Sequence, residues 1–402
     1  MGKGRDTKPH IGIFGRRNNG KSSLINALTG QDIAIVSEIA GTTTDPVKKS
    51  MEIEGIGPTI LVDTAGIDDD GALGTKRIEK TLQTLKIIDA AILVIVQNTF
   101  GEPEERIIAE FNEYDIPFLI IHNKSDIREL APSLKQRLEG KYNCPVLEFS
   151  AMDPDIKKVS AQLKSIIPET IYHNRSLIGA LVKTGDIVLL ITPVDTEAPE
   201  GRMILPQVQV IRDTLDNNCI CLIAKETEVP DLIKTIHPLP ALAITDSQVF
   251  SKADTMIPQE IPLTSFSIVL AHSKGDFDNY LKGTPKLSEL KDGDRILIME
   301  SCTHHVTCDD IGRSKIPRWL SGYSGKKLDF DIISGLDSPP LPVDSYQLAI
   351  QCGGCMFTRK QLLNRLKPFI EANIPVTNYG MAIAWVNGVY KRAVAPFLKP
   401  SL

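Results

Sequence analysis

The chain has 402 residues, of which 42% are hydrophobic and 24% charged, and its formal net charge is -5. This composition excludes a disordered or fibrous chain, and the length predicts about three domains of roughly 150 residues each. The sequence has no dense Lys/Arg block of the kind that binds nucleic acid or an anionic membrane. The longest apolar run, AAILVIV at 90–96, is shorter than the ~20 residues that span a bilayer, and the first ten residues lack an apolar signal core. We therefore expect a cytoplasmic protein without nucleic-acid or membrane partners.

The first motif along the chain is a phosphate-binding loop. The apolar run IGIFG leads into GRRNNGKSS, and the P-loop pattern is matched by Gly15, Gly20, Lys21 and Ser22. Such a loop wraps a phosphate with backbone N–H groups, which glycine permits because it has no side chain. Lys21 is predicted to reach the β- and γ-phosphates, and the Ser22 hydroxyl is predicted to bind magnesium.

Two further motifs fit the γ-phosphate end of a nucleotide site. GTTTD at 41–45 resembles a loop whose threonine senses the γ-phosphate, and Thr43 is predicted to take that role and to bind magnesium. DTAG ends the apolar run TILVD, which would bring Asp63 near magnesium and the Gly66 N–H near the γ-phosphate.

The base end of the site is predicted from NKSD at 123–126, which follows the apolar run PFLIIH. The carboxylate of Asp126 can accept hydrogen bonds from both the ring N–H and the amino group of guanine, a donor pair that adenine lacks. The predicted nucleotide contacts are Asn18, Asn19, Gly20, Lys21, Ser22, Ser23, Thr42, Thr43, Asp63, Gly66, Asn123, Lys124, Asp126, Ser150 and Ala151. Motifs in this order predict a GTP-binding domain.

The same region alternates between predicted strands and helices. The strands are expected near 10–14, 47–53, 58–63, 91–97, 117–121 and 145–149, and the helices near 21–29, 76–88, 102–114, 131–140 and 155–166. This alternation is typical of a mostly parallel, doubly wound sheet whose ligands bind at the carboxyl ends of the strands.

Residues 8 to about 168 resemble the translation-factor-related GTPases of the Era and MnmE type. The resemblance implies GTP hydrolysis in which potassium, bound near Asn18, supplies positive charge in the transition state. Ile67 stands where Ras-like proteins have the glutamine that orients water. The predicted catalytic residues are therefore Lys21, Thr43 and Asn18. The simpler alternative for Asn18 is that its side-chain amide only stabilises the loop.

A second α/β unit is expected from GDIVLLITP, a helical stretch at 203–218, CICLIA, VPDLIKTI and ALAIT. At roughly 80 residues it is small for an independent domain, so we predict that a second copy completes its surface as a homodimer. Cys219 and Cys221 would lie on one face of an apolar strand, which favours two buried thiols over a metal site. Cys144 has no partner nearby in the sequence and is assigned no role.

The third unit has predicted strands FSIVLAH, RILIMES and YQLAIQC and a predicted helix at 359–373. Two of these strands lead directly into Cys302 and Cys352, so both residues are expected at strand ends, where an α/β domain builds a site. The predicted domains are 1–170 for GTP binding, 171–262 for dimerisation and 263–402 for metal binding.

Seven cysteines in a chain without a secretion signal favour free thiols and metal ligands over disulfides. Cys302, His304, Cys352 and Cys355 could form a closed zinc site. Three cysteines with a replaceable fourth ligand suit a 4Fe-4S cluster equally well, and spacing alone does not distinguish the two.

CTHHVTCDDIGRSKIPRWL and CGGCMFTRKQL, with the GTPase domain in front, resemble the HydF family of FeFe-hydrogenase maturation GTPases. The resemblance implies that Cys302, Cys352 and Cys355 hold a 4Fe-4S cluster. Gln351 stands where many family members have histidine. The fourth iron would therefore be bound by His304, by His305, by solvent or by a bound precursor, and Cys308 is close to these histidines in the sequence. For either histidine, a solvated or structural side chain is an equally good interpretation.

This resemblance implies a scaffold that assembles or receives the transient di-iron subcluster precursor and delivers it to the hydrogenase apoprotein. The radical S-adenosylmethionine maturases would be further partners. One alternative is an Era-type GTPase with a structural zinc, acting in RNA or ribosome assembly. A redox or radical enzyme is a third hypothesis, but the sequence lacks a Cys-x-x-x-Cys-x-x-Cys element.

Overall fold

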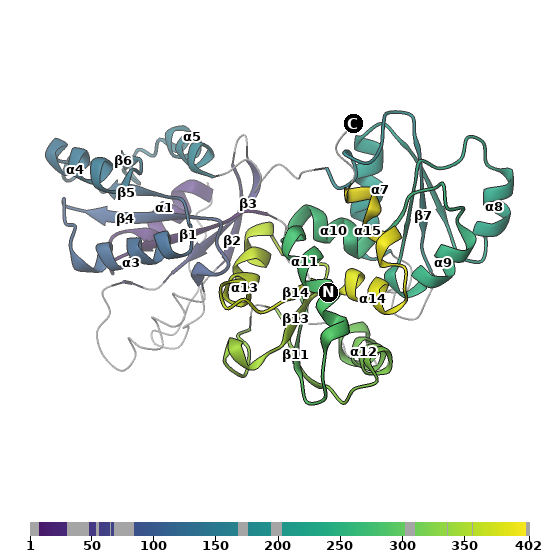
Figure 1. Cartoon of the computed structure of the whole chain (residues 1–402). Coiled ribbons are helices and arrows are strands. Elements are labelled where there is room, and N and C mark those ends of the chain that lie inside the picture. Colours follow the sequence, from purple (N-terminus) through teal and green to yellow (C-terminus); the bar gives the residue numbers. More distant parts are fainter. Residues whose placement is uncertain are drawn as a thin grey trace, which may run out of the picture. The chain divides into compact units, whose positions relative to one another are not determined.

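The computed structural model describes residues 8–29, 48–53, 56–64, 66–67, 84–167, 176–193, 203–301, 310–335, 337–355 and 357–398. The contacts divide the chain at residue 174 into an N-terminal unit and a C-terminal unit, shown in Figure 1. In the described part, no helix combines the length and the hydropathy needed to cross a membrane.

The N-terminal unit is built on a six-stranded sheet in the order β2-β3-β1-β4-β5-β6. Its strands are β1 (His10–Gly15), β2 (Lys48–Ile53), β3 (Gly57–Asp63), β4 (Ala90–Val96), β5 (Phe118–Asn123) and β6 (Val146–Glu148). The pairing of β2 with β3 is antiparallel, and the other pairings are parallel. The described helices of this unit are α1 (Lys21–Thr29), α3 (Glu102–Glu113), α4 (Pro132–Tyr142) and α5 (Ile156–Ile166).

Helices cover both faces of this sheet. On one face, Phe111 of α3 and Leu134 of α4 pack in one cluster with Phe14 of β1. On the other face, Leu24 of α1 and Leu163 of α5 belong to a second cluster. Because both faces are covered, the central strand β4 is apolar along almost its whole length, as expected for a buried parallel strand. The predicted mostly parallel, doubly wound sheet is confirmed. Most of the helix predicted at 76–88 lies outside the described residues.

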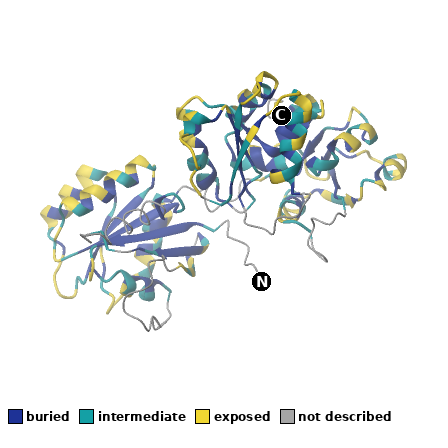
Figure 2. Ribbon diagram, turned by 90° about the horizontal axis from the view of Figure 1, so that it is seen from below, coloured by how far each residue is buried: buried dark blue, intermediate teal, exposed yellow. Residues whose placement is uncertain are grey.

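The C-terminal unit contains two four-stranded parallel sheets, the middle sheet (β10-β9-β7-β8) and the last sheet (β12-β11-β13-β14). The strands of the middle sheet are β7 (Ile187–Ile191), β8 (Ile220–Ala224), β9 (Leu242–Thr245) and β10 (Leu263–Ser265). Those of the last sheet are β11 (Arg295–Met299), β12 (Asp329–Ile333), β13 (Leu348–Gln351) and β14 (Val376–Asn378). Figure 2 shows that the central strands are buried between more exposed helices.

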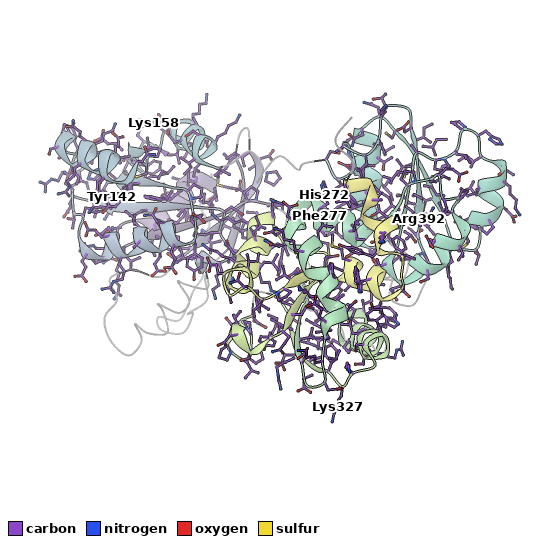
Figure 3. All side chains as sticks on the ribbon, in the orientation of Figure 1. Tyr142, Lys158, His272, Phe277, Lys327 and Arg392 are labelled. Carbon is purple, nitrogen blue, oxygen red and sulfur yellow. The ribbon has the colours of Figure 1, made fainter. Side chains whose placement is uncertain are left out.

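Helices surround both sheets of the C-terminal unit. The described ones are α7 (Leu205–Asp216), α8 (Val229–Thr235), α9 (Phe250–Met256), α10 (Phe266–Lys274), α11 (Phe277–Gly283), α12 (Ile316–Ser324), α13 (Arg359–Glu371), α14 (Tyr379–Val386) and α15 (Tyr390–Leu398). Arg392 of α15, labelled in Figure 3, forms an ion pair with Asp254 at 2.8 Å and donates to the carbonyl of Pro258, which fixes the last helix against the segment after α9.

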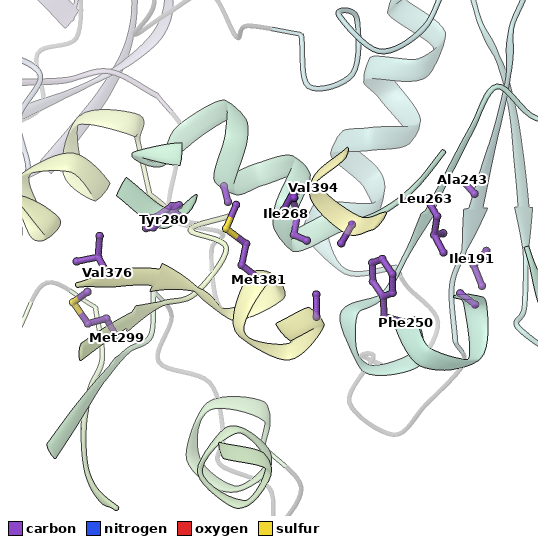
Figure 4. Packing of buried hydrophobic residues seen from close by; sticks show 14 of the residues in the cluster. Ile191, Ala243, Phe250, Leu263, Ile268, Tyr280, Met299, Val376, Met381 and Val394 are labelled. Atoms are coloured by element: carbon purple, nitrogen blue, oxygen red, sulfur yellow. The ribbon is translucent and has the colours of Figure 1, made fainter. Parts of the chain in front are cut away.

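One hydrophobic cluster joins the two sheets of this unit. Figure 4 shows it running from Ile191 and Ala243 in the middle sheet to Met299 and Val376 in the last sheet, with Ile268 of α10 between them. The predicted domain boundary at 262/263 stays a prediction. Both this cluster and the pairing of β10 with β9 contain residues from the two sides of that boundary.

The prediction of a strand at FSIVLAH is wrong, because these residues form helix α10. Ser265, the last residue of β10, caps the helix, and its hydroxyl accepts a hydrogen bond from the N–H of Ile268 at 3.4 Å. The helix buries residues on several faces, namely Phe266, Ile268, Val269, Leu270 and Ala271. A helix that is apolar nearly all round has no 3.6-residue pattern that separates it from a buried strand.

A pair of glycines tests how closely the C-terminal unit is packed. A Cβ on Gly283, at the end of α11, would collide with the backbone of Val376 in β14, whereas a Cβ on Gly322 in α12 would meet nothing within 4 Å. We expect Gly283→Ala to lower the free energy of unfolding by about 1–3 kcal/mol through overpacking. Gly322→Ala is expected to raise it by about 1 kcal/mol, since alanine is the better helix former.

Calorimetric unfolding of the full chain measures both effects in the transition of the C-terminal unit. A stabilising effect of Gly283→Ala would show that α11 does not approach β14 as described.

Candidate functional site

The P-loop connects β1 to α1 in a conformation that requires glycine. Gly20 has φ +80°, and a Cβ at this position would collide with the side-chain amide of Asn123. Lys21 opens α1, and its ammonium donates to the carbonyls of Gly15 and Arg16, both at 3.0 Å. The lysine is thus held over the loop, where its positive charge can meet a phosphate.

Ser22 and Asp63 lie together beside the P-loop. The Ser22 hydroxyl donates to one Asp63 carboxylate oxygen at 3.4 Å, while the other oxygen is buried without a hydrogen-bond partner. Burial raises the pKa of Asp63, and the nearby charge of Lys21 opposes this effect. A buried carboxylate oxygen without a donor fits a site that a hydrated magnesium ion completes.

The guanine motif is hydrogen-bonded directly to the P-loop. The Asn123 amide donates to the carbonyl of Asn19 at 3.0 Å, and the Lys124 ammonium donates to the carbonyl of Asn18 at 3.1 Å. The buried Asn19 amide in turn donates to the carbonyl of Val94 in β4 at 2.8 Å. These bonds hold the carboxyl ends of β1, β4 and β5 around one loop.

At the base end, the exposed Asp126 accepts a hydrogen bond from the Ser150 hydroxyl at 2.7 Å. The same hydroxyl accepts from the N–H of Met152 at 3.1 Å, so the turn after β6 orients it. Ala151, which follows Ser150, is exposed, and so is Ser23, which follows Ser22 in α1. The N–H of Ile67, the residue after Gly66, donates to the carbonyl of Gly15 at 3.3 Å. Thr42 and Thr43 lie outside the described residues.

Sequence analysis missed one pair of residues at the P-loop. Arg16 donates to both carboxylate oxygens of Glu104, at 2.7 and 2.6 Å, and Glu104 also accepts from the N–H of Gly101 at 2.9 Å. Glu104 is completely buried. A glutamate in the first turn of a helix resembles an ordinary solvated charge, so no signal in the sequence singles it out.

A second candidate site lies at the carboxyl ends of β11 and β13. Met299 and Gln351 are register partners in these strands, and the N–H of Cys352 donates to the carbonyl of Met299 at 3.0 Å. The Cys352 sulfur accepts a hydrogen bond from the N–H of Ser301 at 3.1 Å and lies 2.7 Å from the Ser301 hydroxyl. These contacts hold the Cys352 sulfur against Ser301, the residue that follows β11 by two positions in the chain.

Of the other predicted metal ligands, only Cys355 belongs to the part of the chain that the structure describes. Cys302, His304, His305 and Cys308 lie outside the described residues, although Cys302 directly follows Ser301. Cys355 is described and follows the turn of Gly353 and Gly354. Gly354 has φ +69°, and a Cβ there would collide with the side chain of Leu362 in α13. Within the described ranges, no three His, Cys, Asp or Glu residues gather as metal ligands.

Gln351 is completely buried behind Cys352. Its side-chain amide donates to the Ser301 hydroxyl at 3.3 Å and approaches the Cys352 sulfur at 3.7 Å, and its oxygen accepts from Arg365 at 3.4 Å. These contacts make Gln351 a residue that positions the cysteine segment, in line with its weakness as an iron ligand.

The remaining described cysteines have protected thiols. Burial raises the pKa of Cys144 to about 12, and it also raises the pKa values of Cys219 and Cys221. Cys219 is buried next to β8, and its thiol donates to the carbonyl of Lys183 at 3.2 Å. Such thiols stay protonated and are poor metal ligands.

Comparison with known proteins gives relatives for both units. Residues 10–124 match the model described as 50S ribosome-binding GTPase. GTPase Der of Wolinella succinogenes is 36% identical over 152 residues, covering 36% of this chain and 32% of the relative. The tRNA modification GTPase MnmE of Lachnoclostridium phytofermentans is 30% identical over 235 residues, covering 53% of this chain and 50% of the relative. The chain therefore spans about a third to a half of the length of these curated relatives.

Among solved structures, Era of Aquifex aeolicus bound to GDP and AlF4- matches with a TM-score of 0.35 at 19% identity, covering 57% of this chain and 98% of that chain. Residues 177–275 match the hydrogen maturase F dimerization domain, and residues 278–396 match the hydrogen maturase F tetramerization domain. These two domains together occupy more than half of the chain and follow a P-loop GTPase domain. The chain belongs to the hydrogen maturase F (HydF) family.

Proposed function

We propose that this protein is a GTP-hydrolysing iron–sulfur scaffold in FeFe-hydrogenase maturation. It assembles or receives the di-iron subcluster precursor and delivers it to the immature hydrogenase. The observation that carries the proposal is the hydrogen bond from the Ser301 N–H to the Cys352 sulfur at 3.1 Å, in a chain of the HydF family. This bond supports a shared site, because the residue after Ser301 is Cys302.

The N-terminal unit supplies a site for GTP and its hydrolysis to GDP and phosphate. Lys21 is held at the loop for the β- and γ-phosphates, and Asp126 has a carboxylate directed by Ser150 that suits the donor pair of guanine. Ser22 and Thr43 would hold magnesium, with Asp63 close by, and the ion would supply positive charge against the phosphates. Potassium near Asn18 would do the same in the transition state.

The 4Fe-4S cluster would be held by Cys302, Cys352 and Cys355. The donors around the Cys352 sulfur and the glycine turn before Cys355 support this assignment, because a cluster needs thiolates and close backbone approach. The cluster would offer one iron without a cysteine ligand, to which His304, His305, solvent or the precursor could bind. The GTP state would order the segments at Thr43 and Gly66 and so change the affinity for the hydrogenase apoprotein and the radical S-adenosylmethionine maturases.

The middle sheet has features of an association surface and supports a homodimer. Its edge strand β8 exposes Ile220 (53%) and Ile223 (47%), and α7 exposes Val208 (47%) and Leu215 (56%). An edge strand with apolar side chains is a ready partner for another strand, and two copies would cover each other.

The base specificity is tested with Asp126→Asn. The asparagine amide cannot accept from both guanine donors, so the affinity for GTP should fall about tenfold or more. Xanthosine triphosphate should bind better than it does to the unchanged protein, since its carbonyl can accept from the new amide. Titration calorimetry measures both ligands, and Asp153→Asn, an exposed aspartate outside the site, is the control. An unchanged preference for GTP would contradict the base site.

The dimer surface is tested with the double variant Ile220→Lys and Ile223→Lys. Charges on the exposed edge should repel across the interface and convert the dimer to a monomer, as measured by light scattering after size-exclusion chromatography. Ile127→Lys, at a 72% exposed isoleucine of the N-terminal unit, is the matched control and should remain a dimer. Dimers of the double variant at micromolar concentration would rule out this edge as the interface.

The cluster is tested by anaerobic reconstitution with iron and sulfide, followed by electron paramagnetic resonance of the reduced protein. We expect a 4Fe-4S signal that is lost or altered in Cys302→Ala, Cys352→Ala and Cys355→Ala. Cys219→Ala, at a buried thiol elsewhere in the same unit, should keep the signal. Tightly bound zinc without a cluster would instead show that the metal is structural and would end the scaffold proposal.

A further inference from the structure

Arg16, the residue after the first glycine of the P-loop, holds the loop lysine through its backbone. Its carbonyl accepts a hydrogen bond from the Lys21 ammonium at 3.0 Å and another from the N–H of Asn19 at 3.3 Å. The carbonyl of Gly15 accepts from the same ammonium at 3.0 Å. The position of these two carbonyls therefore helps to fix where the positive charge of Lys21 lies.

The side chain of Arg16 ties this part of the loop to helix α3. Its guanidinium donates to both carboxylate oxygens of Glu104, at 2.7 and 2.6 Å. One of these oxygens also accepts from the N–H of Gly101 at 2.9 Å, which holds the carboxylate at the start of its own helix. A paired bond between a guanidinium and a carboxylate fixes the angle between the two groups as well as their distance.

The helix that carries Glu104 is itself fixed in the core of the N-terminal unit. Ile108 and Phe111 of α3 are almost completely buried, and the centres of the Phe111 and Phe14 rings lie 5.0 Å apart in an edge-to-face arrangement. Phe14 directly precedes Gly15 in β1. Glu104 therefore cannot move relative to the start of the P-loop unless the core around it repacks.

Burial separates this ion pair from a surface pair on the same helix. The side chains of Glu104 and Arg16 are 0% and 28% exposed, whereas those of Glu102 and Arg106, which pair at 3.0 Å, are 83% and 68% exposed. Exposed pairs contribute little because water and salt screen them. A buried carboxylate is expensive to leave without its cation, so the pair of Arg16 with Glu104 is the one expected to hold a loop in place.

We infer that Glu104 is a positioning residue for GTP hydrolysis, and that it acts through Arg16 on Lys21. Its carboxylate is occupied by Arg16 and by the N–H of Gly101, so it influences the reaction by holding the loop and not by contacting a phosphate. The Lys21 ammonium has to meet charge that develops in the transition state, and a small displacement of such a group costs rate. The inference rests on the GTPase activity in the proposed function and is independent of the cluster.

The test compares GTP hydrolysis by the full-length protein with that by Glu104→Gln. Glutamine has the same shape and can still accept from the N–H of Gly101, but it lacks the charge that holds the Arg16 guanidinium. We expect kcat to fall about tenfold or more, while KM and the affinity for GDP change by less than about threefold. The affinity for GDP with aluminium fluoride, a transition-state analogue, should fall by about the same factor as kcat in titration calorimetry.

A double variant separates positioning from general stability. Glu104→Gln alone should lower the melting temperature, because it removes the carboxylate that pairs with the Arg16 guanidinium. Arg16→Met combined with Glu104→Gln removes both charges and should recover most of the melting temperature. The kcat of the double variant should stay low, since the ion pair no longer ties the loop to α3. Recovery of kcat together with the melting temperature would show that the pair only stabilises the fold, and would overturn the inference.

Glu102→Gln is the matched control, because it breaks an exposed ion pair in the first turn of the same helix. It should change neither kcat nor the melting temperature. A wild-type kcat in Glu104→Gln, or a raised KM with kcat unchanged, would overturn the positioning role. Absence of GTP hydrolysis in the unchanged protein would instead defeat the GTPase part of the proposed function.

Discussion

The parallel pairing of β11 with β13 is the contact on which the C-terminal site depends. It aligns Met299 with Gln351, so the residues that follow both strands emerge at one edge of the sheet. The N–H of Ser301 can then reach the Cys352 sulfur across a separation of about fifty residues in sequence. Without this register, Ser301 and Cys352 would not lie within hydrogen-bond distance. The same geometry, with carboxyl ends of parallel strands side by side, builds the nucleotide site in the N-terminal unit.

The two sites differ in how much of each is held by hydrogen bonds among the described residues. In the nucleotide site, hydrogen bonds from Asn123 and Lys124 already fix the P-loop, and Glu104 fixes Arg16. The loop therefore pays little conformational entropy when a phosphate binds. At the cysteine site, the described hydrogen bonds join Ser301 and Gln351 to Cys352, while Cys302 lies outside the described residues. The nucleotide site is therefore held in place by its own residues, from three strands of one sheet.

The sequence predicted the P-loop, the guanine motif and the strand that ends directly before Cys352, because each has a local signature. The predicted place of Cys302 at a strand end stays a prediction, since that residue lies outside the described residues. It failed where a segment had no period of its own. FSIVLAH is apolar in nearly every position, and only its burial among both sheets, with Ser265 as the cap, makes it the helix α10. Short elements such as β14, three residues long, were missed for the same reason.

Local chemistry in the sequence was enough to predict a guanine-nucleotide site and to mark a group of cysteines as candidate metal ligands. The glycine spacing, the order of the GTPase motifs and the CxxC pair can each be recognised within a few residues. The charged environment of the sites was not readable in this way. Arg365 and Lys274 lie on helices far from each other in sequence, and Glu104 resembles a surface residue. Folding alone buries Glu104 beside Arg16 and brings Arg365 to Gln351 and Lys274 to the carbonyl of Phe357, because desolvation and charge pairing arise only when distant segments pack together.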